Sequence, residues 1–155
     1  EPVRIGQVRR AALRSVQTPQ VFRFGAILGA HREAARRGVG SYGRHIFLCI
    51  GPDCCTPEEG EAAWKRLKSR VAALNGSAEA GAVYRTKVGC LRVCKCGPVM
   101  VVYPEGTWYA GMTADRIPRF VEEHLVGGRP VEEWVFARNP LESVPDPRSG
   151  RETRG

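Results

Sequence analysis

Six cysteines are the residues in this sequence whose type and spacing point to chemistry. They fall into two clusters separated by a long stretch without cysteine. An even number of cysteines is typical of disulfide-linked secreted proteins, but no charged-then-apolar leader opens this chain. Clustered thiols then indicate metal or redox chemistry instead. The six are Cys49, Cys54, Cys55, Cys90, Cys94 and Cys96.

Two pairs of these cysteines have the spacing of metal ligands. Four residues separate Cys49 from Cys54, and three separate Cys90 from Cys94. Four thiolates that converge satisfy either one tetrahedral zinc ion or the two irons of a [2Fe-2S] cluster, in which each iron takes two thiolates. Spacing alone leaves that choice open. A dithiol oxidoreductase is disfavoured, because no Cys-x-x-Cys motif opens a helix.

Each cysteine pair follows a predicted strand. The apolar run at residues 45–50 leads into the first pair, and the alternating segment at residues 81–88 leads into the second. Between them, Thr56 and Glu59 form a capping box that opens a helix ending at residues 75–76. Loops at the carboxyl ends of strands gather at one edge of an open α/β sheet, so the two pairs can converge there.

The rest of the chain predicts a hairpin and a last helix. Residues 99–103 and 108–112 are strands on either side of a turn at residues 104–106, and Thr113 caps a helix that stops at residues 127–128. The predicted order is β, α, β, β, β, α. This is an α/β fold with a four-stranded mixed sheet and two helices.

Four features in order give residues 44–135 a resemblance to a known family. They are HIFLCIGPDC at the first pair, GCLRVC at the second, the hairpin GPVMVVYPEGTWY and the ending EHLVGGRPVEE. This region resembles the thioredoxin-like [2Fe-2S] ferredoxins, a family that also looks like the small iron–sulfur subunit of bacterial NADH dehydrogenase. The resemblance implies a thioredoxin-like fold, a [2Fe-2S] cluster held by four cysteines, one-electron transfer to redox partner proteins, and a homodimer.

The same resemblance implies a set of ligands. Carried over by position, Cys49, Cys90 and Cys94 are cluster ligands. Cys54 is the expected fourth, because it keeps the four-residue gap of the dehydrogenase subunit, and its neighbour Cys55 is the alternative. Cys96, the remaining cysteine, has no ligand counterpart. The expected function is an electron carrier that is not an enzyme, and the alternative is a zinc-stabilised interaction module without redox activity.

Residues 1–43 differ in composition from the rest of the chain. Eight Arg against two Glu give them +6 of the chain's formal charge of +8. Helical spacing within residues 11–38 predicts a helix, and glycines around Ser41 and Tyr42 mark a boundary. Residues 13–38 resemble a piece of the methylerythritol phosphate cytidylyltransferase family. The Gly-rich nucleotide-binding loop of such an enzyme has no counterpart, so we expect a non-catalytic extension.

These patterns divide the chain into three segments. They are a helical extension at 1–43, a [2Fe-2S] domain at 44–137, and a disordered tail at 138–155 in which prolines lie among charged residues. Apolar runs such as residues 98–103 are too short to cross a bilayer, and no aromatic residues alternate with the N-terminal arginines as a nucleic-acid stacking surface requires. We therefore expect a cytoplasmic protein with no membrane or nucleic-acid partner.

Overall fold

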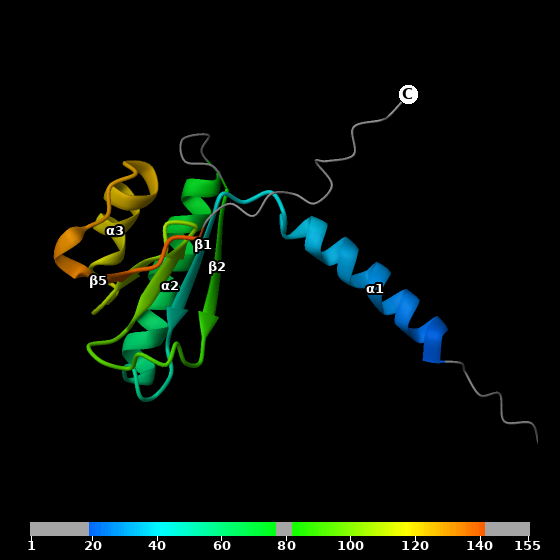
Figure 1. Ribbon diagram of the computed structural model, residues 1–155, viewed down its shortest axis with the longest axis horizontal. Coiled ribbons are helices and arrows are strands. Elements are labelled where there is room, and N and C mark those ends of the chain that lie inside the picture. The colour runs from blue at the N-terminus through cyan, green and yellow to red at the C-terminus, as the bar shows by residue number, and fades with distance from the viewer. Residues whose placement is uncertain (1–18, 77–81, 142–155) are drawn as a thin grey trace, which may run out of the picture. The chain divides into compact units, whose positions relative to one another are not determined.

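The computed structural model describes residues 19–76 and 82–141 (Figure 1). The chain divides into two compact units, Glu1–Gly40 and Ser41–Gly155. The division falls within the glycine-rich stretch that the sequence marks as a boundary. The first unit contributes one described helix, α1 (Pro19–Arg36), so the amino-terminal part of the helix predicted at 11–38 lies outside the described residues.

Helix α1 is polar and solvated at its carboxyl end. Glu33 pairs with Arg36 and Arg37 at 2.7 Å each, and hydrogen bonds from both arginines lower the pKa of its carboxyl group. Ile27 and Leu28 are about half exposed. Neither α1 nor any other helix in the described part of the chain has the length and hydrophobicity needed to cross a membrane.

The second unit is built on one mixed sheet. Among the described residues, five strands lie in the order β2-β1-β3-β4-β5. β1 runs parallel to β2, with Cys49 opposite Val88, and the other pairings are antiparallel. Figure 1 shows β1 and β2 side by side. The strands are β1 (Arg44–Cys49), β2 (Val83–Val88), β3 (Met100–Tyr103), β4 (Thr107–Tyr109) and β5 (Val135–Arg138).

The fifth strand is a correction to the predicted count of four. β5 pairs antiparallel with β4, and beyond it the backbone N–H of Asn139 donates to Gly106 O and that of Leu141 to Pro104 O. The tail was predicted to begin at residue 138, whereas the chain stays bonded to the hairpin through Leu141. β5 escaped prediction because it is short and mostly exposed, so it lacks an alternating apolar pattern. The rest of the predicted tail lies outside the described residues.

Two helical segments cover one face of the sheet. α2 (Pro57–Asn75) begins with the predicted capping box, in which the Thr56 side chain accepts from Glu59 N and the Glu59 side chain accepts from Thr56 N. The last helix begins later than predicted. Thr113 accepts a turn bond from Arg116 N, and α3 (Ile117–Phe120) then continues as the π-helical η1 (Val121–Val126).

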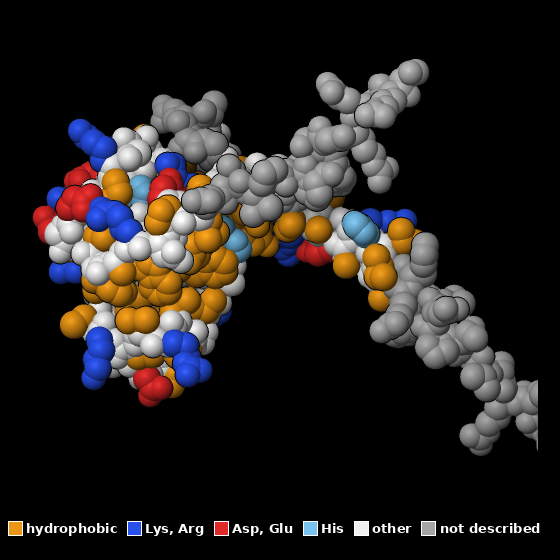
Figure 2. Space-filling model, viewed as in Figure 1, with side chains coloured by type: hydrophobic (Ala, Val, Ile, Leu, Met, Phe, Trp, Pro, Cys, Tyr) orange, Lys and Arg blue, Asp and Glu red, His pale blue; other side chains and the backbone are white. Residues whose placement is uncertain are grey.

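The two faces of the sheet differ in how they are covered. Alternate residues of β1 and β3, such as Ile46 and Met100, pack with α2 and α3 in the main core. The opposite face carries ring contacts, including His45 to Phe47 at 4.0 Å and His45 to Tyr84 at 5.0 Å. Figure 2 shows hydrophobic side chains gathered over the body of this unit. We call this second face the aromatic face; its residues are His45, Phe47, Tyr84, Tyr103 and Trp108.

Four polar residues, two of them buried and two partly buried, lie where β1 begins. Arg44 Nε donates to Glu105 Oε1 at 2.5 Å, and its Nη1 donates to Leu125 O. His124 is buried, its Nδ1 hydrogen-bonds with the Tyr109 hydroxyl at 2.7 Å, and its Nε2 lies 4.0 Å from Glu105 Oε1. Burial lowers the pKa of His124 to about 4. We call these four residues, Arg44, Glu105, Tyr109 and His124, the polar end.

Candidate metal centre

The two cysteine loops meet because β1 and β2 are parallel and end side by side. We call residues 50–55 the first cysteine loop and residues 89–98 the second. Ile50 N donates to Val88 O at 3.0 Å, which extends the parallel pairing by one residue. A Cβ on Gly51 would collide with the carbonyl oxygen of Gly89, so the loops touch backbone to backbone where only glycine fits.

Cys49 and Cys54 form a buried pair. Cys49 ends β1 and is fully buried, and the alternation along β1 places it on the aromatic face rather than the helix face. Cys54 is 9% exposed and accepts a hydrogen bond from Val99 N at 3.3 Å. Burial, together with a hydrogen bond to Cys49, raises the pKa of the Cys54 thiol to about 12. A Cβ on Gly97 would collide with Cys54, so this loop also packs backbone against sulfur.

Cys90 and Cys94 form a second pair that is open to solvent. Cys90 is exposed and Cys94 is half-buried, and their sulfur atoms lie 3.6 Å apart. Arg92 has a φ of 64°, and its N–H donates to Cys90 Sγ at 3.2 Å. The hydrogen bond between Cys94 and Cys90 raises the pKa of Cys94. The tight turn at Arg92 therefore supplies an amide donor to the exposed sulfur.

The two sulfur pairs lie on neighbouring loops. Cys49 and Cys54 form a small apolar cluster with Val99, and Cys94 packs against that cluster together with Val88, Leu91 and Trp108. Within the described residues, however, no group of three or more His, Cys, Asp or Glu side chains is close enough to hold a single metal ion. The sulfur atoms thus form two pairs rather than one tight tetrahedron.

The remaining two cysteines belong to neither sulfur pair. Cys55 Sγ lies 3.1 Å from where a Cβ on Gly60 of α2 would be, so the thiol is directed at the helix. Burial and the charges of Cys49 and Glu59 raise its pKa. Cys96 is exposed at a φ of 53°, and its carbonyl oxygen accepts from Gly111 N at 2.6 Å.

The sulfur spacing fits thiolates that share a tetrahedral metal ion, either alone or as half of a two-metal group. Two thiolates on one tetrahedral metal at a bond length of about 2.3 Å lie about 3.8 Å apart, and Cys90 and Cys94 are at 3.6 Å. Each pair has a backbone amide aimed at one of its sulfurs, and such donors stabilise thiolate charge. The sequence carries no local signal for the Val99 donor, whose N–H is directed at sulfur by the packing of the chain as it enters β3.

Known proteins share this region of the chain. It is 30% identical over 100 residues to a 2Fe-2S ferredoxin from Aquifex aeolicus (strain VF5), an alignment covering 61% of this chain and 90% of that protein. It is 32% identical over 92 residues to a 2Fe-2S ferredoxin from Clostridium pasteurianum, covering 57% and 90%. The chain belongs to the [2Fe-2S] ferredoxin family. These ferredoxins are electron carriers, which agrees with the predicted class of a carrier that is not an enzyme.

Solved structures of the ferredoxin family confirm the predicted fold. The thioredoxin-like [2Fe-2S] ferredoxin from Aquifex aeolicus superposes with a TM-score of 0.55 at 28% identity, covering 63% of this chain and 94% of that one. A second structure, of the wild-type protein, gives a TM-score of 0.52, also at 28% identity, covering 61% and 96%. No family model matches the chain.

A weaker match concerns a different kind of protein. The chain is 40% identical over 86 residues to the bifunctional enzyme IspD/IspF from Nitrobacter hamburgensis, covering 48% of this chain but only 21% of that enzyme. This match agrees with the resemblance of residues 13–38 to a cytidylyltransferase fragment. Because so little of the enzyme is covered, the match assigns no activity to this chain.

Proposed function

We propose that the second unit binds a [2Fe-2S] cluster through Cys49, Cys54, Cys90 and Cys94 and carries single electrons between redox partner proteins. The observation that supports this most directly is the arrangement of the sulfurs as two pairs at the meeting point of two loops. When bound, the cluster supplies a one-electron couple at two irons, each needing two thiolates. A zinc-stabilised module remains the alternative, since zinc also takes four thiolates.

Residues of this chain would bind the cluster, keep water from one side of it and set how easily it is reduced. Cys49 and Cys54 anchor it at the buried end of β1, against the apolar wall of Val99 and Trp108. The amides of Val99 and Arg92 donate to sulfur, and such donors favour the more negative, reduced state. Burial of the first pair keeps water from that side of the site.

Metal and sulfide analysis tests the cofactor. We expect the full chain, purified without oxygen, to contain about two iron and two acid-labile sulfide per chain and to show visible absorption that dithionite bleaches. Reoxidation should restore the colour, because only one electron moves and no bond breaks. A colourless protein with one zinc and no sulfide would establish the alternative.

The fourth ligand is tested by adjacent substitutions. Cys54 is favoured because its thiol hydrogen-bonds to Cys49, whereas Cys55 is directed at Gly60. Cys54→Ser should abolish or alter the cluster spectrum, and Cys55→Ser should leave it intact. The opposite result would transfer the ligand role to Cys55.

We further propose that the ferredoxin unit is a homodimer in the cytoplasm. The aromatic face supports the dimer, because Phe47, Tyr84 and Tyr103 are only half-buried there and a second copy could cover them. Six free cysteines suit a compartment that keeps thiols reduced. Phe47→Glu should convert a dimer to a monomer in sedimentation velocity, and Lys68→Glu on α2 should not. A monomeric unsubstituted chain would contradict the dimer.

A further inference from the structure

The second cysteine loop presents an exposed, basic surface beside the candidate cluster. Of the four proposed ligands, Cys90 is the one that the structure leaves exposed. Arg92, Val93 and Lys95 on the same loop are also exposed, and Val93 shows 38% of its surface. An electron passing between this cluster and another protein would have its shortest route to solvent here.

The positive charges of this loop are not neutralised within the described part of the chain. Arg92 and Lys95 form no ion pair there, whereas Arg70 and Arg138 on other surfaces pair with glutamates at 2.7 and 2.5 Å. Asp53 on the first cysteine loop is exposed as well, and its charge acts on Cys94. Arg92 and Lys95 give the second cysteine loop two positive charges.

A pocket continues this surface toward the carboxyl end of the unit. It has a volume of about 390 Å³, and Cys96 and Gly97 of the second cysteine loop line one side. Arg116 lines another side. Its Nη1 donates to Gly111 O at 3.2 Å and Ala110 O at 3.5 Å, and its guanidinium lies 5.0 Å from the centroid of the Trp134 ring.

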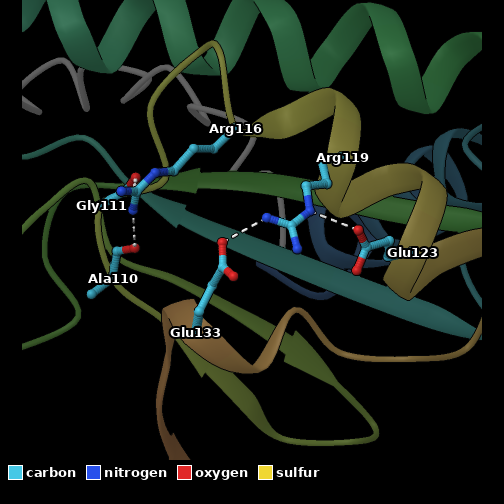
Figure 3. Close-up of polar contacts among 6 residues, drawn as sticks. All are labelled: Ala110, Gly111, Arg116, Arg119, Glu123 and Glu133. Atoms are coloured by element: carbon cyan, nitrogen blue, oxygen red, sulfur yellow. Dashed lines mark hydrogen bonds and ion pairs between the residues drawn. The ribbon is translucent and has the colours of Figure 1, made fainter.

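The pocket has a cation without a carboxylate partner. Figure 3 shows Glu133 at the pocket bound to Arg119, at 2.6 Å, and Arg119 also bound to Glu123. The negative charge of Glu133 is thus already matched. Asp115, next to Arg116, is hydrogen-bonded to Thr113, and its charge attracts that of Arg116 without forming an ion pair with it. Arg116 forms no ion pair among the described residues, so its charge is available to a ligand.

We propose that Arg92, Val93, Lys95 and the Arg116 pocket form the docking surface for an acidic face of a redox partner protein. This rests on the proposed electron-carrier function. Arg92 and Lys95 would steer the partner, Val93 would make an apolar contact at the centre, and a carboxylate side chain of the partner would enter the pocket to pair with Arg116. Complementary charges of this kind mainly raise the association rate and suppress wrong partners.

The rates of electron transfer to one anionic and one cationic small oxidant test whether Arg92 and Lys95 attract anions to this surface. The reduced protein loses one electron and the oxidant gains it, with hexacyanoferrate(III) as the anion and hexaamminecobalt(III) as the cation. At low ionic strength, Arg92→Glu/Lys95→Glu should slow the reaction with the anion about tenfold and speed that with the cation. Added salt should remove both differences.

A matched control separates the local charge from the net charge. Lys68→Glu/Arg129→Glu makes the same change in net charge at exposed residues on α2 and after η1. This control should change each rate less than about twofold. Equal effects of the two double variants would overturn the proposal. If Arg92→Glu/Lys95→Glu loses the visible spectrum of the cluster, the neutral variant Arg92→Asn/Lys95→Gln takes its place, because Asn tolerates the positive φ at residue 92. About a threefold change in each rate is then expected.

Binding measurements test the class of partner without relying on the cluster. In calorimetry, poly-glutamate should bind the full chain at low salt, and both Arg92→Glu/Lys95→Glu and Arg116→Gln should weaken it severalfold. A single-stranded oligonucleotide of equal charge should bind more weakly, because we expect the pocket to receive a carboxylate side chain that pairs with Arg116. Tighter binding of the oligonucleotide, or no effect of the variants, would overturn the proposal. A protein without iron or sulfide would instead refute the electron-carrier function.

Discussion

The two ends of β1 carry opposite chemistry. At its carboxyl end, Cys49 and Cys54 are sulfur donors inside an apolar wall, and backbone contacts hold the loops together. At its amino end, Arg44 and Glu105 form an ion pair above a buried histidine. From this difference we expect the proposed ligands to be independent of the residues at the amino end. Substitution of the cysteines should affect the cluster, whereas substitutions at the amino end should change the free energy of unfolding and leave the cluster spectrum unchanged.

The largest expected effect is at the cysteine end. Cys49→Ser removes a fully buried sulfur at the end of β1 and should abolish the [2Fe-2S] spectrum and the bound iron. Cys96→Ser is the matched control, because Cys96 is exposed and outside the sulfur pairs, and it should retain the full iron content. Visible absorption and iron analysis measure both. Loss of iron from the Cys96 variant but not from the Cys49 variant would show that Cys96, and not Cys49, is the ligand.

The next effect concerns the contact between the loops. Gly51→Ala would place a methyl group into the carbonyl oxygen of Gly89, so we expect a loss of about 2–4 kcal/mol in the free energy of unfolding. Gly89→Ala is the control on the opposite side of the same contact. Its Cβ would meet nothing within 4 Å, and the expected change is below about 0.5 kcal/mol. Urea unfolding measures both. Similar losses in the two variants would mean that the loops do not meet at this point.

At the polar end, the effect is on stability alone. Glu105→Gln leaves the Arg44 guanidinium without its partner, and both side chains are less than a third exposed, so we expect a loss of about 1–3 kcal/mol in unfolding free energy. The cluster spectrum should not change. The control, Glu132→Gln, breaks an exposed pair with Arg138 and should cost less than about 0.5 kcal/mol. A changed spectrum in the Glu105 variant would show that the two ends are coupled.

The last effect is the pH dependence of stability at the polar end. The pKa of His124 is lowered to about 4, so between pH 6.5 and pH 4 the unfolded chain binds a proton that the folded chain does not. Stability should therefore fall by up to about 3 kcal/mol as the pH drops through this window, with no pH-dependent contribution from His124 above it. Glu105, Arg44, Arg138 and Glu132 are the charged groups that act on it. His124→Gln should flatten the slope in urea unfolding, and an unchanged slope would contradict the assignment.

The sequence predicted the cysteine end better than the polar end. Strand and capping signals are local, so β1, β2 and the start of α2 were predictable, and parallel strands place their following loops together. The contact between Gly51 and Gly89 was not predictable, because it depends on two segments far apart in sequence. The pairing of His124 with Tyr109 arises from the π-helical η1 and β4, and neither residue carries a local signal for it.

The parallel pairing of β1 with β2 has a consequence for the order of assembly. In the unfolded chain the two cysteine pairs are independent, because the whole of α2 lies between them in sequence. They meet only after the crossover through α2 has closed, which is a non-local and intrinsically slow folding event. Before that point a metal ion would meet only separate pairs of thiols. We therefore expect cluster insertion to occur late in folding, only in chains in which β1, α2 and β2 have already come together.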